Sequence, residues 1–194
     1  MLEYRREHND PEAKDLIIEP RMIVVHYTAG SSLKATWRYF NQTRMESARK
    51  KLAKAGEANV SAHFLVDRDG TVYRLMAETQ MARHCIGLNH VALGIENIGG
   101  GKGYPLTDAQ VDANAALIRH LTSKHKITHV VGHHEAWRME DHAYFRERDP
   151  KDRNRKPDPG PVFMQRVRAK VSDLNLQGPP GEARRDQRTR APKW

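Results

Sequence analysis

The chain has 194 residues, enough for one ordinary domain with a substantial core. No segment approaches the roughly 18 continuous apolar residues of a transmembrane helix, and the single cysteine, Cys85, excludes an internal disulfide and a cysteine-rich zinc site. The net charge of +9 favours a polyanionic partner such as nucleic acid, anionic lipid or a cell-wall polymer, although a solvated basic surface explains it equally well.

The N-terminal part of the chain predicts an arm followed by a strand and a helix. Residues 1–20 are polar and charged, and they contain no apolar stretch of the signal-peptide kind, which leaves the compartment open. Residues 21–27 are apolar and β-branched, so they predict a buried strand with His26 at its carboxyl end. Residues 33–42 have the spacing of an amphipathic helix with Ser31 or Ser32 as N-cap.

The middle of the chain predicts a hairpin and a buried strand. Residues 45–58 are rich in Lys, Arg and Ala, which fits a short helix or an inserted loop with a basic face. Residues 60–66 and 71–75 flank a turn signal at 67–70 and predict paired strands. Residues 91–98 predict another buried strand, whose one ionisable residue is Glu96.

The last elements alternate helix, strand and helix. Thr107 is expected to cap a long helix whose apolar face includes Val111, Ala115, Ile118 and Leu121. Residues 127–132 predict a strand that ends at His133, and residues 135–155 are interpreted as a charged irregular segment too polar to enter the core.

Pro161 fits the first turn of a final helix through Val162, Val167 and Val171. Residues 176–194 are predicted to be a basic, disordered tail, because they are rich in Gly, Pro, Arg and Asp. The expected organisation is therefore an arm at 1–20, a domain at 21–175 and a tail at 176–194.

Two histidines and one aspartate suggest a metal site. His26 and His133 each directly follow a predicted strand, so neighbouring strands can present both imidazoles at one edge of a sheet. Asp158 lies in a segment with three prolines, which stiffen the backbone around it. Together they form a two-His, one-carboxylate zinc site with a position left for water. Taken singly, each histidine fits a structural role better, and Asp158 fits a turn.

Two further residues suggest chemistry beside that metal. Glu96 interrupts an apolar strand, where a carboxylate must either have a charged or hydrogen-bonding partner or take part in catalysis. The second case suits a general base. The alternative is an edge strand on which Glu96 faces water. Lys156, two residues before Asp158, has the charge to stabilise an oxyanion, although a solvated lysine explains it as well.

The chain resembles the zinc-dependent N-acetylmuramoyl-L-alanine amidases of type 2, which are related to bacteriophage lysozyme-amidases and peptidoglycan recognition proteins. The resemblance covers about residues 22–171 and depends on the order of its blocks. These blocks are His26-Tyr27-Thr28-Ala29, Ser61-Ala62-His63-Phe64, Gly70-Thr71-Val72-Tyr73, Gly94-Ile95-Glu96-Asn97, Gly132-His133 and Lys156-Pro157-Asp158-Pro159-Gly160.

The resemblance implies an α/β fold with a central mixed β-sheet flanked by helices, in agreement with the predicted elements. It implies one Zn²⁺ per chain, with His26, His133 and Asp158 as ligands and Glu96 and Lys156 as catalytic residues. His63, His84 and Asn97 are expected at the substrate, although a supporting or packing role suits each of the two histidines equally well. His133 is preferred to His134 because the family's ligand directly follows the glycine. The implied reaction is hydrolysis of the amide between the lactyl group of N-acetylmuramic acid and L-alanine of the stem peptide.

Three segments depart from the family's pattern, and they affect how the substrate is recognised rather than the zinc chemistry. The segment between His133 and Lys156 is longer than usual, the basic stretch 44–57 is enlarged, and Arg83-His84-Cys85 replaces a Trp-His-Ala type sequence.

Two other functions compete with this one: a peptidoglycan-binding module without catalysis, and a basic nucleic-acid-binding protein. The second lacks stacking aromatics and any known motif, so no specific nucleic acid is expected. We expect a monomer that binds peptidoglycan or muropeptides in the cell envelope, in the periplasm or outside the cell, with a cytoplasmic or phage-borne protein left open.

Overall fold

The computed structural model describes residues 1–45 and 55–181. The expected helix or loop at 45–58 falls largely outside the described residues, as does most of the expected tail. The described part of that tail, up to Gly181, follows the domain surface, where Gln177 bridges to His129. Within the described residues, no helix is both long and apolar enough to span a membrane.

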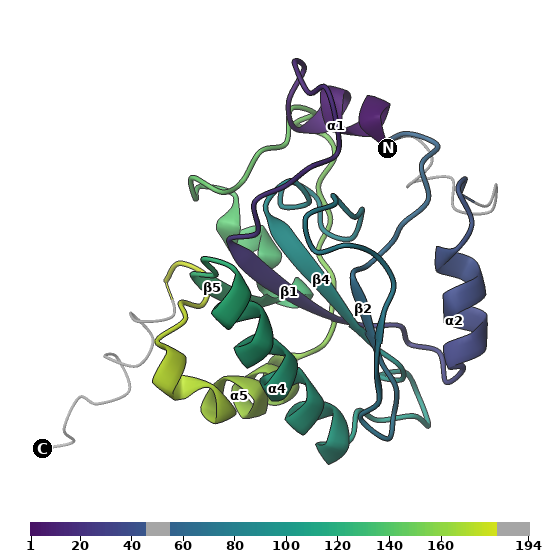
Figure 1. Cartoon of the computed structure of the whole chain (residues 1–194), viewed down its shortest axis with the longest axis vertical. Coiled ribbons are helices and arrows are strands. Elements are labelled where there is room, and N and C mark those ends of the chain that lie inside the picture. The colour runs from purple at the N-terminus through teal and green to yellow at the C-terminus, as the bar shows by residue number, and fades with distance from the viewer. Residues whose placement is uncertain (46–54, 182–194) are drawn as a thin grey trace, which may run out of the picture.

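A five-stranded mixed sheet forms the centre of the protein, with strand order β3-β2-β4-β1-β5 (Figure 1). The strands are β1 (Met22–Tyr27), β2 (Phe64–Val66), β3 (Val72–Arg74), β4 (Ala92–Asn97) and β5 (His129–Gly132). Strands β2, β4, β1 and β5 run parallel, and β3 pairs antiparallel with β2 at one edge. The structure confirms the predicted α/β class and all five strands, with shorter bounds.

The described α-helices are placed as the sequence predicts, with one addition. They are α1 (Leu2–His8), α2 (Leu33–Phe40), α4 (Asp108–Lys124) and α5 (Pro161–Lys170), and the 3-10 helices are η1 (His133–Met139) and η2 (Ser172–Leu174). The addition is α1, which lies in the predicted arm and buries Tyr4 and His8. Residues 1–20 therefore contain a helix that packs against the domain, and not only a polar arm.

Local sequence signals explain where the helices begin. Ser32 caps α2, because its hydroxyl accepts a hydrogen bond from Ala35 N at 3.2 Å. Thr107 and Gln110 form a reciprocal capping box at the start of α4. Pro161 occupies the first turn of α5, where a backbone N–H would have no hydrogen-bond acceptor within the helix, so its absence does not destabilise the helix.

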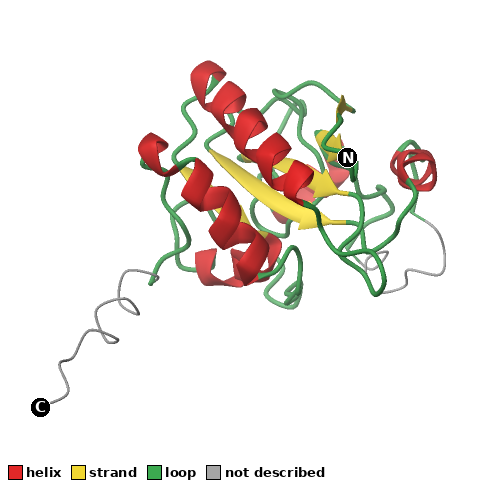
Figure 2. Cartoon of the chain, turned by 90° about the horizontal axis from the view of Figure 1, so that it is seen from below, coloured by secondary structure: helices red, strands yellow, loops and turns green. Residues whose placement is uncertain are grey.

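The sheet has a core on each face. Helices α4 and α5 cover one face (Figure 2), with Ile23, Ile95, Ile118 and Met164 among the residues buried there. On the other face, Met22, Leu88 and Met139 pack together.

Two expectations about the core are wrong. The segment 135–155 was expected to stay outside the core, yet Ala136 and Met139 of η1 are buried in it, because the short 3-10 helix returns directly onto the sheet. Val162 was expected on the apolar face of the last helix, but it is 70% exposed, whereas Val167 and Val171 are buried as predicted.

Candidate active site

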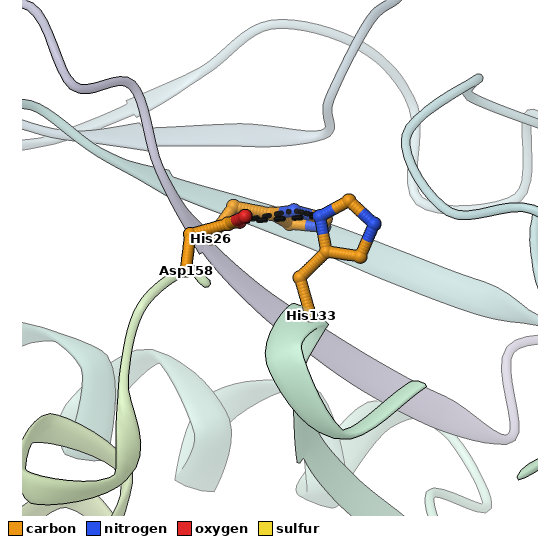
Figure 3. A group of neighbouring side chains, drawn as sticks. All are labelled: His26, His133 and Asp158. Carbon is orange, nitrogen blue, oxygen red and sulfur yellow. Dashed lines mark hydrogen bonds and ion pairs between the residues drawn. The ribbon is translucent and has the colours of Figure 1, made fainter. Parts of the chain in front are cut away.

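The structure brings His26, His133 and Asp158 together (Figure 3). His26 Nδ1 lies 3.0 Å from His133 Nδ1 and 3.2 Å from Asp158 Oδ2, and His133 Nδ1 lies 3.1 Å from the same carboxylate oxygen. Three ligand atoms from residues up to 132 positions apart therefore form a nearly equilateral triangle.

The parallel sheet explains how the two histidines meet. Strand β1 lies between β4 and β5, and all three run in the same direction, so their carboxyl ends lie at one edge. His26 is near the end of β1, and His133 directly follows the end of β5. A neighbouring pair of parallel strands thus presents both imidazoles on the same side.

Asp158 is held in place through its backbone. Its carbonyl accepts a hydrogen bond from the backbone N–H of His134 at 2.6 Å, and the side chain is only 10% exposed. Prolines on both sides restrict the backbone further. His134, which the sequence analysis did not favour as a ligand, therefore anchors the arm that carries Asp158.

The donor set fits zinc. Bonds of about 2.0–2.2 Å in a tetrahedral site separate the ligand atoms by roughly 3.3–3.6 Å, slightly more than the spacing seen here. Burial lowers the pKa of His26 to about 4, with His133 adding to the effect, so its imidazole is neutral and available as a ligand. Burial raises the pKa of Asp158, but hydrogen bonds to His133 and His26 outweigh it and hold the carboxyl well below its usual range.

His84 orients His26. Its Nδ1 lies 3.0 Å from His26 Nε2, and its Nε2 lies 3.2 Å from the carbonyl oxygen of Ala92. Since that carbonyl accepts the His84 Nε2 proton, His84 Nδ1 accepts the proton of His26 Nε2 and leaves His26 Nδ1 free to bind a metal. Histidine ligands are commonly fixed through their second nitrogen in this way.

Gly94 makes room for His84. A Cβ atom at this position would lie 2.8 Å from His84 Cγ, closer than side chains tolerate. The glycine in the middle of β4 therefore has a steric reason that the strand pattern alone did not reveal.

Glu96 and Lys156 line the same cleft as the three candidate ligands. Glu96 is the register partner of His26 on the neighbouring strand β4. Both Glu96 and Lys156 line a cleft of about 420 Å³ that also contains His26, His133 and Asp158. Helix α2 supplies part of the cleft wall through Ala35, Thr36, Tyr39 and Phe40.

Two residues predicted to contact substrate lie elsewhere. His63 is 0% exposed, and its nitrogens are used by the backbone: Gly94 N donates to Nδ1 at 3.0 Å, and Nε2 donates to Gln80 O at 2.9 Å. Asn97 is also 0% exposed. Neither lines the cleft, so both residues support the sheet instead; His84 does line the cleft.

A chain of side-chain amides holds the carboxyl edge of the sheet. Asn97 Nδ2 donates to His26 O at 2.9 Å, and its Oδ1 accepts from Asn114 of α4 at 2.7 Å. Gln110, also on α4, donates to the carbonyls of Val66 and Ile98. The helical pattern placed Gln110 and Asn114 on α4, but only their burial identifies them as supports of the site.

Glu135 is a further supporting residue that the sequence analysis did not identify. Its carboxylate accepts from Gly132 N at 2.7 Å and from Arg168 of α5 at 2.6 Å. Burial raises the pKa of Glu135, but the Arg168 guanidinium outweighs this effect and lowers it. The pair fixes the turn at which β5 passes into η1 and thereby sets the position of His133.

Two imidazoles and a carboxylate at the carboxyl edge of an α/β sheet, with an acid on the adjacent strand, are typical of metal-dependent hydrolases. Residues 18–161 match the family of N-acetylmuramoyl-L-alanine amidases (Amidase_2), and the chain belongs to this family. No curated protein matches the sequence.

Solved structures share the fold. The N-acetylmuramoyl-L-alanine amidase LysC from Clostridium intestinale is 24% identical with a TM-score of 0.55, over 82% of this chain and 88% of that one. Human PGRP-IBETAC, in complex with glycosamyl muramyl pentapeptide, is 20% identical with a TM-score of 0.56, over 79% and 85%. The amidase AmiD from E. coli, in complex with anhydro-N-acetylmuramic acid-L-Ala-D-gamma-Glu-L-Lys, is 20% identical with a TM-score of 0.54, over 82% and 60%.

Proposed function

We propose that this protein is a zinc-dependent N-acetylmuramoyl-L-alanine amidase. It hydrolyses the amide between the lactyl group of N-acetylmuramic acid and L-alanine of the peptidoglycan stem peptide. The observation that carries the proposal is the convergence of His26, His133 and Asp158 within 3.2 Å of one another, with Glu96 on the adjacent strand.

In this proposal, His26, His133 and Asp158 hold one zinc ion, which when bound lowers the pKa of water and polarises the amide carbonyl. Glu96 accepts the proton of the attacking water as the new C–O bond forms, and delivers it to the nitrogen as the C–N bond breaks. The Lys156 ammonium stabilises the oxyanion that develops on the carbonyl oxygen.

The cleft suits a peptide attached to a sugar. It combines the aromatic side chains of Tyr27, Tyr39 and Phe40 with polar groups around the proposed metal site. Aromatic walls give a ring or a peptide plane a large contact area, and polar groups fix its orientation. The net charge of +9 adds a general attraction to the anionic polymers of cell envelopes.

The main competing function is peptidoglycan binding without catalysis. The complex of human PGRP-IBETAC with glycosamyl muramyl pentapeptide shows that a protein with this fold binds such a ligand. The full set of three ligands, Glu96 and Lys156 in one cleft favours the enzyme. We propose that the protein acts as a monomer on envelope peptidoglycan or its fragments.

Mass spectrometry of muropeptides after incubation with the protein tests the reaction. We expect free stem peptides with a new L-alanine amine, together with glycans that retain the lactyl group. Glu96→Gln is expected to keep the zinc and to lose at least about 100-fold in turnover, because the base is removed while the ligands remain. Binding of muropeptides without any cleavage by the zinc-loaded wild type would support the non-catalytic alternative. Loss of zinc from Glu96→Gln would contradict the separation of base from ligands.

A further inference from the structure

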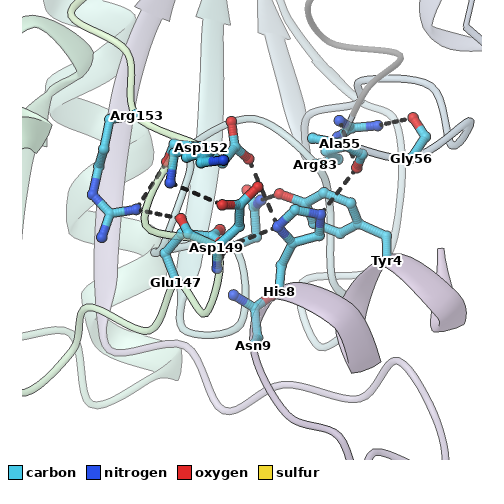
Figure 4. A network of polar contacts seen from close by, with 12 residues as sticks. Tyr4, His8, Asn9, Ala55, Gly56, Arg83, Glu147, Asp149, Asp152 and Arg153 are labelled. Carbon is cyan, nitrogen blue, oxygen red and sulfur yellow. Dashed lines mark hydrogen bonds and ion pairs between the residues drawn. The ribbon is translucent and has the colours of Figure 1, made fainter.

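A second group of side chains that can hold a metal ion, outside the proposed catalytic set, joins α1 to the segment after η1 (Figure 4). His8 at the end of α1 meets Glu147 and Asp152 from the segment after η1, and their donor atoms all lie within 4.8 Å of one another. None of these residues belongs to the proposed catalytic set. They join the two parts of the chain in which the structure departs most from the sequence reading: the N-terminal arm and the segment 135–155.

The His8 ring is fixed with one nitrogen toward the two acids. Its Nε2 lies 3.1 Å from the carbonyl oxygen of Ala55, which can only accept, so Nε2 carries a proton. Its Nδ1 faces Glu147 Oε1 at 2.8 Å and Asp152 Oδ2 at 3.7 Å. A ring that donates one N–H to a carbonyl and turns its other nitrogen toward carboxylates has the arrangement of a metal-ligating histidine.

The Glu147 carboxylate supplies an independent indication. Its side chain is 0% exposed, and its Oε1 accepts from the backbone N–H of Asp149 at 2.9 Å. Its Oε2 is buried without a hydrogen-bond partner among the described residues. A buried polar atom without a partner costs about 1–3 kcal/mol, a cost that a bound cation removes.

The surroundings of Asp152 also favour a cation. Its side chain is 18% exposed, and burial raises the pKa of both Asp152 and Glu147 by more than the neighbouring charge of His8, and at Asp152 also that of Arg83, lowers it. Two neighbouring carboxylates that lose solvent are stabilised by a divalent ion between them. The ring of Tyr4 stacks on His8 at 4.3 Å and keeps the imidazole in this orientation.

We propose that His8, Glu147 and Asp152 form a second metal site, which binds a divalent transition-metal ion such as Zn²⁺ or Mn²⁺. One imidazole with two carboxylates suits these ions, whereas the absence of thiolates from the set argues against softer ones. The three ligands leave coordination positions for water.

The second ion would act on the cleft through its wall. Tyr4 and Asp152 both line the cleft that contains His26 and Asp158. Two further contacts join the same segments: Asn9 Nδ2 donates to Arg146 O at 2.6 Å, and Arg148 N donates to His8 O at 3.0 Å. The ion therefore fastens α1 to the segment 145–152 and holds this end of the cleft in shape, without taking part in the chemistry.

Calorimetric titration of the metal-free full chain with Zn²⁺, and separately with Mn²⁺, tests the proposal. We expect two ions per wild-type chain for at least one of these metals, and one fewer for Glu147→Gln and for Asp152→Asn. Asp141→Asn, a change at an exposed acid of the same segment, is the matched control and should keep both ions. A single ion in the wild type that both site variants retain, or two ions in both site variants, would overturn the second site.

Thermal unfolding in the Asp158→Asn background separates the two sites. Added metal should raise the Tm of Asp158→Asn, and adding Glu147→Gln should abolish most of this gain. An equal gain in both proteins would show that the ion does not bind at His8, Glu147 and Asp152. Because neither measurement reads amidase activity, failure of this site and failure of the proposed function are distinguishable. Asp152→Asn replaces Glu147→Gln if the latter does not fold, since Asp152 is partly exposed.

Discussion

His26 shows how much of this site depends on single contacts. One ring nitrogen faces His133 and Asp158, and the other is held by His84. An imidazole whose two ring nitrogens are both held in place loses little conformational entropy when it binds a metal. Substitutions beside His26 are therefore expected to act on metal affinity, and substitutions of the groups facing substrate on turnover.

Lys156→Ala tests the expected effect on turnover. We expect kcat to fall by about 100- to 1,000-fold with zinc retained, since the variant loses the cation assigned to the oxyanion and none of the ligands. Lys156→Arg should recover part of the rate. Steady-state kinetics together with metal analysis measure both quantities. An unchanged rate in Lys156→Ala would remove this residue from the mechanism.

Gly94→Ala tests the expected effect on metal affinity. The added methyl group would lie 2.8 Å from His84 Cγ, so His84 must move away from His26. We expect zinc affinity to fall by about 10- to 100-fold, as for other partners of metal-ligating histidines. Gly30→Ala is the control, because a Cβ atom there meets nothing within 4 Å. Competition with a chelating dye measures both variants, and equal affinities would refute the orienting role of His84.

At the scale of the element, helix α4 connects the core to the site. Its N-terminal half holds the strand ends through Gln110 and Asn114. At its C-terminal end, Lys124 and the following His125 contact Glu78 at 2.7 Å each. Stability at this far end is thus predicted to depend on pH without any direct effect on the metal ligands.

Glu78→Gln tests this dependence. Burial raises the pKa of Glu78, but the contacts with Lys124 and His125 outweigh it, so the native pKa is lowered. The unfolded chain therefore binds the proton more tightly, and the stabilisation is complete above the unfolded pKa of about 4.3 and is lost as the pH falls through the native value. We expect the wild type to be more stable than Glu78→Gln by about 1 kcal/mol at pH 7.

Urea unfolding across the pH range measures the difference, which should shrink below about pH 4. Glu12→Gln, at an exposed position, is the control and should follow the wild type throughout. A difference between Glu78→Gln and wild type that stays constant down to pH 3 would contradict the ion pair as its cause.

At the scale of the whole molecule, metal binding and folding are linked, because the ligands come from distant parts of the chain. Removal of metal by a chelator should abolish activity and lower the Tm. With free zinc at about 100 times its Kd, the stabilisation is about 2.7 kcal/mol, which corresponds to roughly 5–10 °C. Differential scanning calorimetry with and without zinc measures the shift, and readdition of zinc should restore activity. Full activity in the presence of chelator would exclude a metal-dependent reaction.

The strands and two of the three residues that meet at the edge of the sheet could be located from the sequence, because each depends on local signals. Residues 21–27, 91–98 and 127–132 are short apolar runs, and two of the three ligands directly follow or end such a run. Helix α1 could not be predicted, since its seven residues are mostly charged and only Tyr4 and His8 are buried. Its position depends on contacts with residues 145–152, more than 130 positions away.

The sequence by itself determined the order of the elements, the family blocks and the residues at the carboxyl ends of the strands, because periodicity and turn signals are local properties of the chain. The tertiary structure alone decided that His84 supports His26, that His63 and Asn97 lie beneath the cleft rather than in it, and that His8 meets Glu147 and Asp152. These outcomes depend on the direction of side chains between segments far apart in the sequence, and packing fixes that direction only once the strands and loops are in place.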